Sequence, residues 1–430
     1  MGAGIAQLAC VGGLETSLHD PVPEALAAGE ARLREGLAKG ATRGMWSESE
    51  ARAAIERLHP AATIDDLREC DLVVEAAPED LELKRDLFAR VASVCGPDAI
   101  LATNTSSLSV TAIAAGTERP ERVCGMHFFN PPPLMRLVEV VAGDETSEST
   151  LEAVTEVARA MRREPIRAAD AIGFVANRLA RPFTLEALRL LGERVASHDQ
   201  IDRIVRVGGG FRMGPFELMD LVGVDVNFEV AKSFWEQSFH EPRWQPHPIQ
   251  ARTVAAGRHG RKTGRGYYDY GGERHRPADP DPPERDPAWR RDPAVESSVR
   301  HFAFPNLDAA SLVELARDPS MSDDDAEATE RYFRAAGMHV EWVREAPGLV
   351  LGRILAQIVN EAHFAVGQEV AGPKDCDTAM RLGFNWPRGP FELVAAIGPG
   401  RVVSVLDELH AELGEERYRV APLLRRAATA

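Results

Sequence analysis

The stretch GMHFFNPPPLMRLVEVV, residues 125–141, joins two apolar runs through a proline-rich turn. Each run has the length and the Val, Met and Phe content of a buried strand, and the three consecutive prolines separate them. His127 lies at the end of the first predicted strand, and Glu139 lies on the strand that returns. This layout can bring the carboxylate beside the imidazole. A carboxylate that accepts a hydrogen bond from one ring nitrogen leaves the other nitrogen free to take a proton.

Upstream of this stretch, predicted strands alternate with helical segments. A helix is expected over residues 78–94, where apolar side chains recur at helical spacing. Such alternation indicates an α/β domain of the Rossmann type, a doubly wound parallel sheet covered on both faces. From residue 173 onward the pattern is almost wholly helical, and the Pro- and charge-rich stretch 271–293 is predicted to be a linker. The predicted strands are residues 14–19, 71–76, 100–103, 123–128 and 137–141.

The sequence also contains an internal repeat. A shift of 175 positions aligns residues 173–191 with residues 348–366 without a gap, and it places GPFEL (214–218) on a second GPFEL (389–393). Two copies of one all-α unit are therefore predicted. The second copy is expected to be preceded by a remnant of the first domain's last helix and strand.

The repeat sets the predicted domain organisation. The second copy has Gly352 where the first has Asn177, and it is expected to lack counterparts of His127 and Glu139, so it is predicted to be structural. The two copies are expected to pair within the chain as an internal pseudo-dimer, and a homodimer of whole chains is the other arrangement considered. The predicted domains are a nucleotide-binding Rossmann-like domain (1–170), a first helical domain (171–270), a linker with a degenerate Rossmann remnant (271–346) and a second helical domain (347–430).

Composition limits the choice of partners. The 430-residue chain has a formal net charge of −16 at pH 7, which argues against nucleic acid or an anionic membrane as a partner. No apolar run approaches the ~18 residues that a membrane span requires. The five cysteines form no C-x-x-C pair and no metal-ligand spacing, which suits reduced thiols in a cytosol. A cytoplasmic protein without a bound metal is expected.

The first twenty residues, MGAGIAQLACVGGLETSLHD, are not expected to be a signal peptide, because no basic residue precedes Arg32. Asp20 follows Gly2 at about the spacing at which a carboxylate hydrogen-bonds an adenosine ribose and disfavours a 2′-phosphate. NAD is therefore expected over NADP.

The segments NTSSL (104–108) and HFFNPPPLMRLVEVV (127–141), together with GFVANR (173–178) and GPFEL, closely resemble the L-3-hydroxyacyl-CoA dehydrogenase family. The resemblance runs from Met1 to about Tyr270, and the repeat resembles the longer members with two helical tails. It implies NAD-dependent oxidation of a (3S)-3-hydroxyacyl-CoA to a 3-oxoacyl-CoA. The alternative is a catalytically weak or inactive binding homologue.

The resemblance implies roles for individual residues. From the residues alone, a histidine between Met126 and Phe128 is more often a core residue than a catalytic one. By resemblance, His127 is the general base and Glu139 orients it. Ser106 corresponds to the serine that hydrogen-bonds the reacting oxygen, and Asn177 to the asparagine that holds the thioester end of the substrate.

The cofactor residues implied by the resemblance are Gly2, Asp20, Glu79, Lys84 and Asn104. Glu79 and Lys84 fit a solvated helix face almost equally well. Family members begin with a strand followed by G-x-G-x-M-G-A-G-I-A, of which this chain has only the end. We therefore expect that the first strand of the sheet is missing from this chain, that Gly2 is the glycine that allows close helix–strand packing, and that the natural protein extends further upstream.

Two-tailed members of the family act on substrates such as 3-hydroxyadipyl-CoA or 3-hydroxybutyryl-CoA. Arg136 or Arg178 is the candidate for contact with a distal carboxylate. Arg32, Arg34 and Lys39, on the helix expected after Asp20, are the candidates for contact with the CoA phosphates.

Overall fold

The computed structural model describes residues 1–318 and 320–429, and the chain divides into two compact units. The first unit comprises Met1–Ala176 together with Glu369–Phe384, and the second comprises Asn177–Gln368 together with Asn385–Ala430. Residues 369–384 thus group with the first unit, whereas the sequence prediction counted them with the second helical domain.

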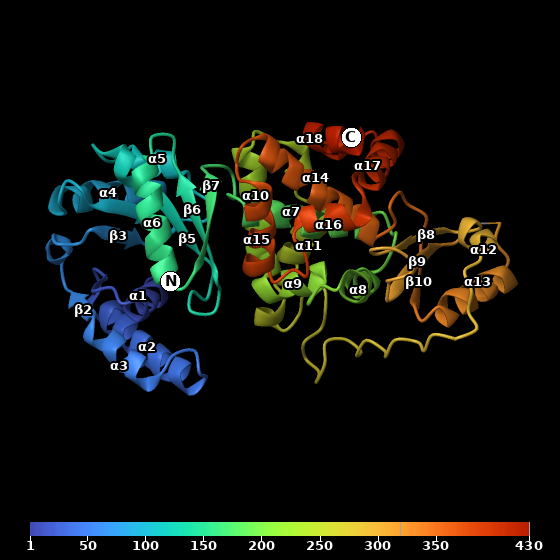
Figure 1. The fold of residues 1–430 in the computed structure, drawn as a ribbon, viewed down its shortest axis with the longest axis horizontal. Coiled ribbons are helices and arrows are strands. Elements are labelled where there is room, and N and C mark those ends of the chain that lie inside the picture. Colours follow the sequence, from blue (N-terminus) through green and yellow to red (C-terminus); the bar gives the residue numbers. More distant parts are fainter. Residues whose placement is uncertain (319, 430) are drawn as a thin grey trace. The chain divides into compact units, whose positions relative to one another are not determined.

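A five-stranded sheet forms the centre of the first unit, with the strand order β3-β4-β5-β6-β7 (Figure 1). Its pairings are parallel except for β5–β6, which is antiparallel. Strands β1 and β2 pair with each other in a separate parallel sheet, and no strand of the described residues joins β1 to β3. The five predicted strands are present, and β2 and β7 are additional. The strands are β1 (Thr16–His19), β2 (Leu58–Ala61), β3 (Leu72–Glu75), β4 (Ile100–Thr103), β5 (Val123–Phe128), β6 (Leu137–Ala142) and β7 (Glu164–Ala169).

Helix α1 is buried on two sides. Ile5 and Leu8 pack against the apolar residues of the five-stranded sheet, while Ala6 and Cys10 pack against the second and third helices. Because both sides are covered, the helix is apolar around most of its circumference. The helices of this unit are α1 (Gly2–Val11), α2 (Pro23–Thr42), α3 (Glu48–Glu56), α4 (Leu81–Val94), α5 (Val110–Ala114), α6 (Glu148–Ala160) and α15 (Pro373–Gly383).

Two long helices, α7 and α14, form the buried centre of the second unit. They begin and end at positions related by the 175-residue shift. Among the described residues, no helix has the length and apolar character that crossing a membrane requires. The helices of this unit are α7 (Ala176–Gly192), α8 (His198–Arg203), α9 (Pro215–Val222), α10 (Val224–Gln237), α11 (Pro248–Ala255), α12 (Pro293–Ser297), α13 (Asp323–Ala335), α14 (Leu351–Gly367), α16 (Pro390–Ile397), α17 (Pro399–Leu413) and α18 (Pro422–Thr429).

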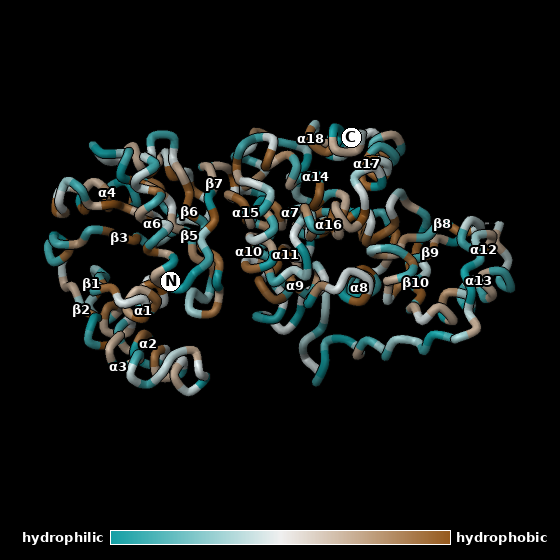
Figure 2. Tube along the Cα trace, viewed as in Figure 1, coloured by the Kyte–Doolittle hydropathy of each residue, from teal (hydrophilic) through white to brown (hydrophobic). Residues whose placement is uncertain are grey.

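The second unit also contains a three-stranded sheet, which the sequence prediction underestimated. Its strands are β8 (Arg300–Ala303), β9 (Leu312–Ala316) and β10 (His339–Val343). Strands β8 and β9 are antiparallel and β9 and β10 are parallel, which repeats the arrangement of β5, β6 and β7. The remnant ahead of the second copy therefore contains three strands, the helix α13 and the short helix α12, not a helix and one strand. Residues 271–292 contain no helix or strand and are mostly teal in Figure 2, as expected of a polar linker.

Candidate active site

His127 and Glu139 lie directly opposite each other on the antiparallel pair β5–β6. His127 Nδ1 is 2.6 Å from Glu139 Oε2. The histidine is 5% exposed and the glutamate is fully buried. An ionised carboxylate can only accept hydrogen bonds, so this contact places the proton on Nδ1 and leaves the lone pair of the neutral ring on Nε2.

The second oxygen of Glu139 has a separate function. Oε1 accepts hydrogen bonds from the backbone N–H groups of Val175, at 3.0 Å, and Ala176, at 2.9 Å. These groups follow a tight turn in which Gly173 and Phe174 have positive φ values of 69° and 48° and lead into the first residue of α7. The first N–H groups of a helix have no partner within the helix, so a buried carboxylate is well placed to satisfy them. Glu139 therefore connects the imidazole to the start of α7.

Aromatic side chains surround the imidazole. The ring centroid of Phe129 is 4.6 Å from that of His127, and the centroid of Phe174 is 5.8 Å away. Such contacts restrict rotation of the ring and exclude water from one side of it. The imidazole is thus held in one orientation by a charge-assisted hydrogen bond and by packing.

The predicted cofactor residues Glu79 and Lys84 belong to one ionic network, in which Lys84 is buried and Glu79 is exposed. Lys84 Nζ lies 2.7 Å from Glu75 Oε1 and 3.3 Å from Glu79 Oε2. Lys84 is 1% exposed, so the interpretation as a solvated helix face is wrong for this residue. Burial raises the pKa of Glu79, but hydrogen bonds from Ser106 and Thr105 and the charge of Lys84 outweigh it, and the net pKa is lowered.

Glu75 is a residue of this network that the sequence reasoning missed. It ends β3 and is 6% exposed. It accepts hydrogen bonds from Lys84 and from Thr103 Oγ1, at 2.8 Å, which lies at the end of the neighbouring strand β4. A single acidic residue after three apolar ones, Leu72 to Val74, was the signal that could have revealed it.

Ser106 and Asn104 lie in the loop after β4, on the same side of the sheet. Asn104 Oδ1 accepts the N–H of Phe128 at 2.8 Å and so ties this loop to the strand that carries His127. The Ser106 N–H donates to Glu79 at 2.8 Å, while its hydroxyl oxygen is 3.4 Å from the same carboxylate. The loop thus brings four predicted residues to the carboxyl ends of β3, β4 and β5, the edge where α/β domains bind their ligands. They are Glu79, Asn104, Ser106 and His127.

Two further predicted cofactor residues, Gly2 and Asp20, lie at the start of α1 and directly after β1. Asp20 follows β1 and its side chain accepts the N–H of Val22 at 2.9 Å, so it also stabilises the turn before α2. A Cβ atom on Gly2 would meet nothing within 4 Å, so the expected close contact between this glycine and a strand is not present. Helix α1 begins without a side-chain cap and without an acidic residue in its first turn.

The second unit contains Asn177 and Arg178, at the start of α7. Asn177 is half-buried. Arg178 is buried and bound on both sides, with Nε 2.7 Å from Glu361 Oε1 and Nη2 2.6 Å from Gln368 Oε1. Arg178 is therefore not available for a substrate carboxylate, and this sequence-based candidate is wrong.

A second copy of the carboxylate arrangement lies in the three-stranded sheet. Glu314 of β9 accepts the N–H groups of Val350 and Leu351 at 2.7 and 3.0 Å, just before and at the first residue of α14. It corresponds to Glu139 under the 175-residue shift, so the expectation that Glu139 has no counterpart was wrong. The position opposite Glu314 is Phe302, where the first copy has His127. Burial raises the pKa of Glu314 to about 8.

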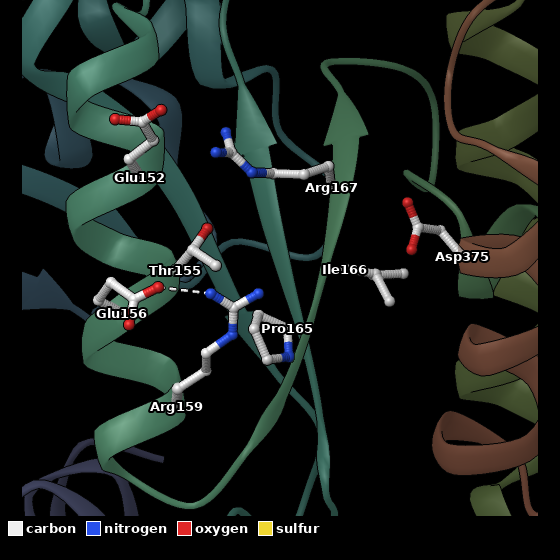
Figure 3. A pocket seen from close by; sticks show the side chains of 8 residues that line it. All are labelled: Glu152, Thr155, Glu156, Arg159, Pro165, Ile166, Arg167 and Asp375. Carbon is white, nitrogen blue, oxygen red and sulfur yellow. Dashed lines mark hydrogen bonds and ion pairs between the residues drawn. The ribbon is translucent and has the colours of Figure 1, made fainter.

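A surface hollow of the first unit contains none of the predicted residues. It lies between α6, β7 and the start of α15 and is lined by eight residues, among them Glu156, Arg159 and Asp375 (Figure 3). Glu156 and Arg159 form an ion pair with each other there. The candidate site is therefore the edge of the sheet that carries His127, not this hollow.

Comparison with known proteins relates both parts of the chain to one family. Residues 1–171 match the NAD binding domain of 3-hydroxyacyl-CoA dehydrogenase, and residues 173–270 and 348–430 match its C-terminal domain. The chain is 38% identical to 3-hydroxyadipyl-CoA dehydrogenase of Escherichia coli strain K12, over 100% of this chain and 95% of that protein. It is also 38% identical to 3-hydroxybutyryl-CoA dehydrogenase of Clostridioides difficile, over 63% of this chain and 96% of that protein.

A solved structure shares the whole architecture. The crystal structure of 3-hydroxybutyryl-CoA dehydrogenase from Escherichia coli K12 matches with a TM-score of 0.93 and 37% identity, covering 100% of this chain and 96% of that one. Both matches to the C-terminal domain coincide with the two copies found in the sequence. The chain belongs to the family of NAD-dependent 3-hydroxyacyl-CoA dehydrogenases.

Proposed function

We propose that this chain oxidises the 3-hydroxyl group of a (3S)-3-hydroxyacyl-CoA, with His127 as the general base and Glu139 as the residue that orients it. The observation that carries the proposal is the 2.6 Å contact between His127 Nδ1 and the buried Glu139 carboxylate. Oxidation of a secondary alcohol removes a hydride and a proton from one carbinol. Nε2 of His127 accepts the proton, and Glu139 stabilises the imidazolium that forms. Ser106 is the proposed hydrogen-bond donor to the reacting oxygen, and Asn177 the proposed partner of the thioester.

The residues of the first unit fit NAD. The uncapped start of α1 leaves N–H groups free for a pyrophosphate, and Gly2 offers an approach without a side chain. Asp20 keeps one carboxylate oxygen beyond its turn hydrogen bond, as a ribose contact requires. Glu79, Lys84 and Asn104 lie at the carboxyl ends of the neighbouring strands. When bound, NAD accepts the hydride.

The substrate class follows from the relatives. Relatives described above carry the names 3-hydroxyadipyl-CoA and 3-hydroxybutyryl-CoA dehydrogenase, so acyl-CoA esters of four to six carbons are the proposed substrates. Four of the five cysteines are buried, and Cys10, Cys70, Cys95 and Cys124 form no disulfide, which supports the proposed cytoplasmic location.

The second copy is proposed to pair with the first as an internal pseudo-dimer. Two reciprocal ion pairs support this arrangement. Arg178 of the first copy binds Glu361 of the second at 2.7 Å, and Arg353 of the second binds Glu186 of the first at 2.6 Å. The shift of 175 residues converts each pair into the other, as an isologous two-fold interface requires.

A reciprocal exchange of helices gives further support. Helix α15 of the second copy packs on β6 and β7, and the corresponding segment of the first copy, residues 198–208, packs on β9 and β10. The glycine that permits each contact occupies the same repeat position. A Cβ on Gly383 would come within 2.8 Å of Leu137, and one on Gly208 within 3.4 Å of Leu312.

The test is NADH formation with 3-hydroxybutyryl-CoA and with 3-hydroxyadipyl-CoA. Turnover by the wild-type chain, and its loss in His127→Gln, are the expected results. No turnover with any 3-hydroxyacyl-CoA would instead favour a binding homologue, and turnover of His127→Gln near the wild-type rate would remove this histidine from the mechanism.

A further inference from the structure

Three arginines of α7 are buried. Arg178 and Arg189 form ion pairs with glutamates, whereas no ion pair of Arg181 is found among the described residues. Arg181 is 6% exposed, and its Nη1 has no hydrogen-bond partner among the described residues. Its Nε donates only to the backbone carbonyl of Asn177, at 3.4 Å. Burial lowers the pKa of Arg181 to about 10, and no carboxylate in the described part of the chain opposes this effect. A buried cation without a counter-charge is costly, so its presence calls for a reason.

The internal repeat separates structural residues from functional ones. Arg178 and Glu186, which hold the two copies together, are both retained in the second copy, as Arg353 and Glu361. Arg181 is not retained in the second copy. The corresponding residue there is Ala356, which is buried and apolar. Asn177 is lost in the same copy, where Gly352 takes its place and a Cβ would lie 2.6 Å from Phe302. The copy that lacks His127 has therefore lost Arg181 as well.

The position of Arg181 relates it to the substrate. It follows Asn177 by four residues, so both project from one face of α7, about 6 Å apart along the helix axis. An extended chain of about five carbon–carbon bonds covers this distance. The Nε–carbonyl contact directs the guanidinium back toward Asn177. Phe234, with its ring centroid 5.5 Å from Arg181 Cζ, supplies an apolar wall.

We propose that Arg181 binds a carboxylate at the far end of the acyl chain and so selects dicarboxylic 3-hydroxyacyl-CoA esters. This inference rests on the proposed function, because it places the thioester at Asn177. One guanidinium neutralises one carboxylate, whereas a CoA phosphate carries up to two negative charges and would remain unbalanced in a buried site. The distal carboxylate of the substrate therefore provides the negative charge that pairs with the Arg181 guanidinium.

The experiment compares ligands that differ only in the distal group. Binding of adipyl-CoA and of hexanoyl-CoA, both lacking the 3-hydroxyl, is measured by calorimetry on the wild-type chain and on Arg181→Met. The wild-type chain is expected to bind adipyl-CoA more tightly. In Arg181→Met the ratio of the two affinities is expected to fall about tenfold to hundredfold, the loss of one charge-assisted hydrogen-bonded pair. Arg212→Met, which removes an exposed arginine of the same unit, leaves the ratio unchanged.

The other outcomes overturn the proposal. Equal weakening of both ligands assigns Arg181 to the shared CoA moiety or to the fold, and an unchanged ratio removes it from recognition altogether. Should Arg181→Met not fold, the wild-type chain still decides, because adipyl-CoA must raise its melting temperature more than hexanoyl-CoA does. Binding requires no turnover, so a failure of this test is separate from a failure to form NADH.

Discussion

Replacing Glu139 by Gln separates its catalytic contact from its structural one, because the chain contains a matched control. Glu139 and Glu314 are both fully buried, and each accepts two backbone N–H groups at the start of a central helix. Only Glu139 also contacts a histidine. A glutamine amide keeps one oxygen for the two N–H groups, but it presents NH₂ to His127 Nδ1. The ring then carries its proton on Nε2 and cannot accept another.

The expected loss of kcat follows from that tautomer. A base held in the wrong tautomer, and deprived of the charge that stabilises its imidazolium, loses about 10³- to 10⁴-fold in kcat, or about 4 to 5.5 kcal/mol in activation free energy. Glu314→Gln has no histidine to misorient, so its kcat stays within about twofold of wild type. The assay is steady-state NADH formation with 3-hydroxybutyryl-CoA, with thermal unfolding of both variants as the fold control. Equal losses of kcat in the two variants would show that helix anchoring, not the imidazole, explains the effect and would refute the reasoning.

Three further results are expected. His127→Gln abolishes turnover but retains NADH binding, measured by fluorescence titration, because the imidazole is separate from the Lys84 network; loss of both activities would contradict this. Arg353→Met leaves Glu186 and Glu193 without their shared partner and lowers the unfolding free energy by about 3 to 5 kcal/mol in denaturant titration, whereas removal of the exposed Arg194 changes it by less than about 0.5 kcal/mol. Glu314 has a folded-state pKa of about 8, above the usual 4.5, so the native state binds the extra proton between these values; its contribution to stability is fully present below about pH 4.5 and falls by about 1.4 kcal/mol per pH unit up to about pH 8. Glu314→Gln removes this fall, and an unchanged slope in the variant would show that another group titrates.

The contact between His127 and Glu139 could be predicted because register alone produces it. An antiparallel pair joined by a short turn places residues opposite each other, and here residues 127 and 139 are such partners. Two of the strands that were missed, β2 and β7, lack this local signal. β2 contains Pro60 and β7 contains Pro165, and both lie at a sheet edge, where proline is tolerated and neighbouring strands supply the stabilisation.

The second buried carboxyl group, Glu314, also has a signal in the sequence. Leu-Val-Glu occurs at residues 137–139 and again at residues 312–314, in the same 175-residue register as the helices. The burial of Lys84, in contrast, could not be predicted from the sequence. Its burial depends on Glu75, on a different element, so no helical pattern could distinguish it from a solvated lysine.

Comparison of Glu139 with Glu314 indicates which contact of this glutamate the fold itself requires. In the second copy Glu314 still anchors α14, although Phe302 replaces the histidine. Because that carboxyl group persists in a copy without a catalytic histidine, helix anchoring is a sufficient reason to keep it. The catalytic contact of Glu139 therefore uses the remaining oxygen of a residue that the fold already requires. A substitution at Glu139 that abolishes activity is for this reason informative only beside the same substitution at Glu314.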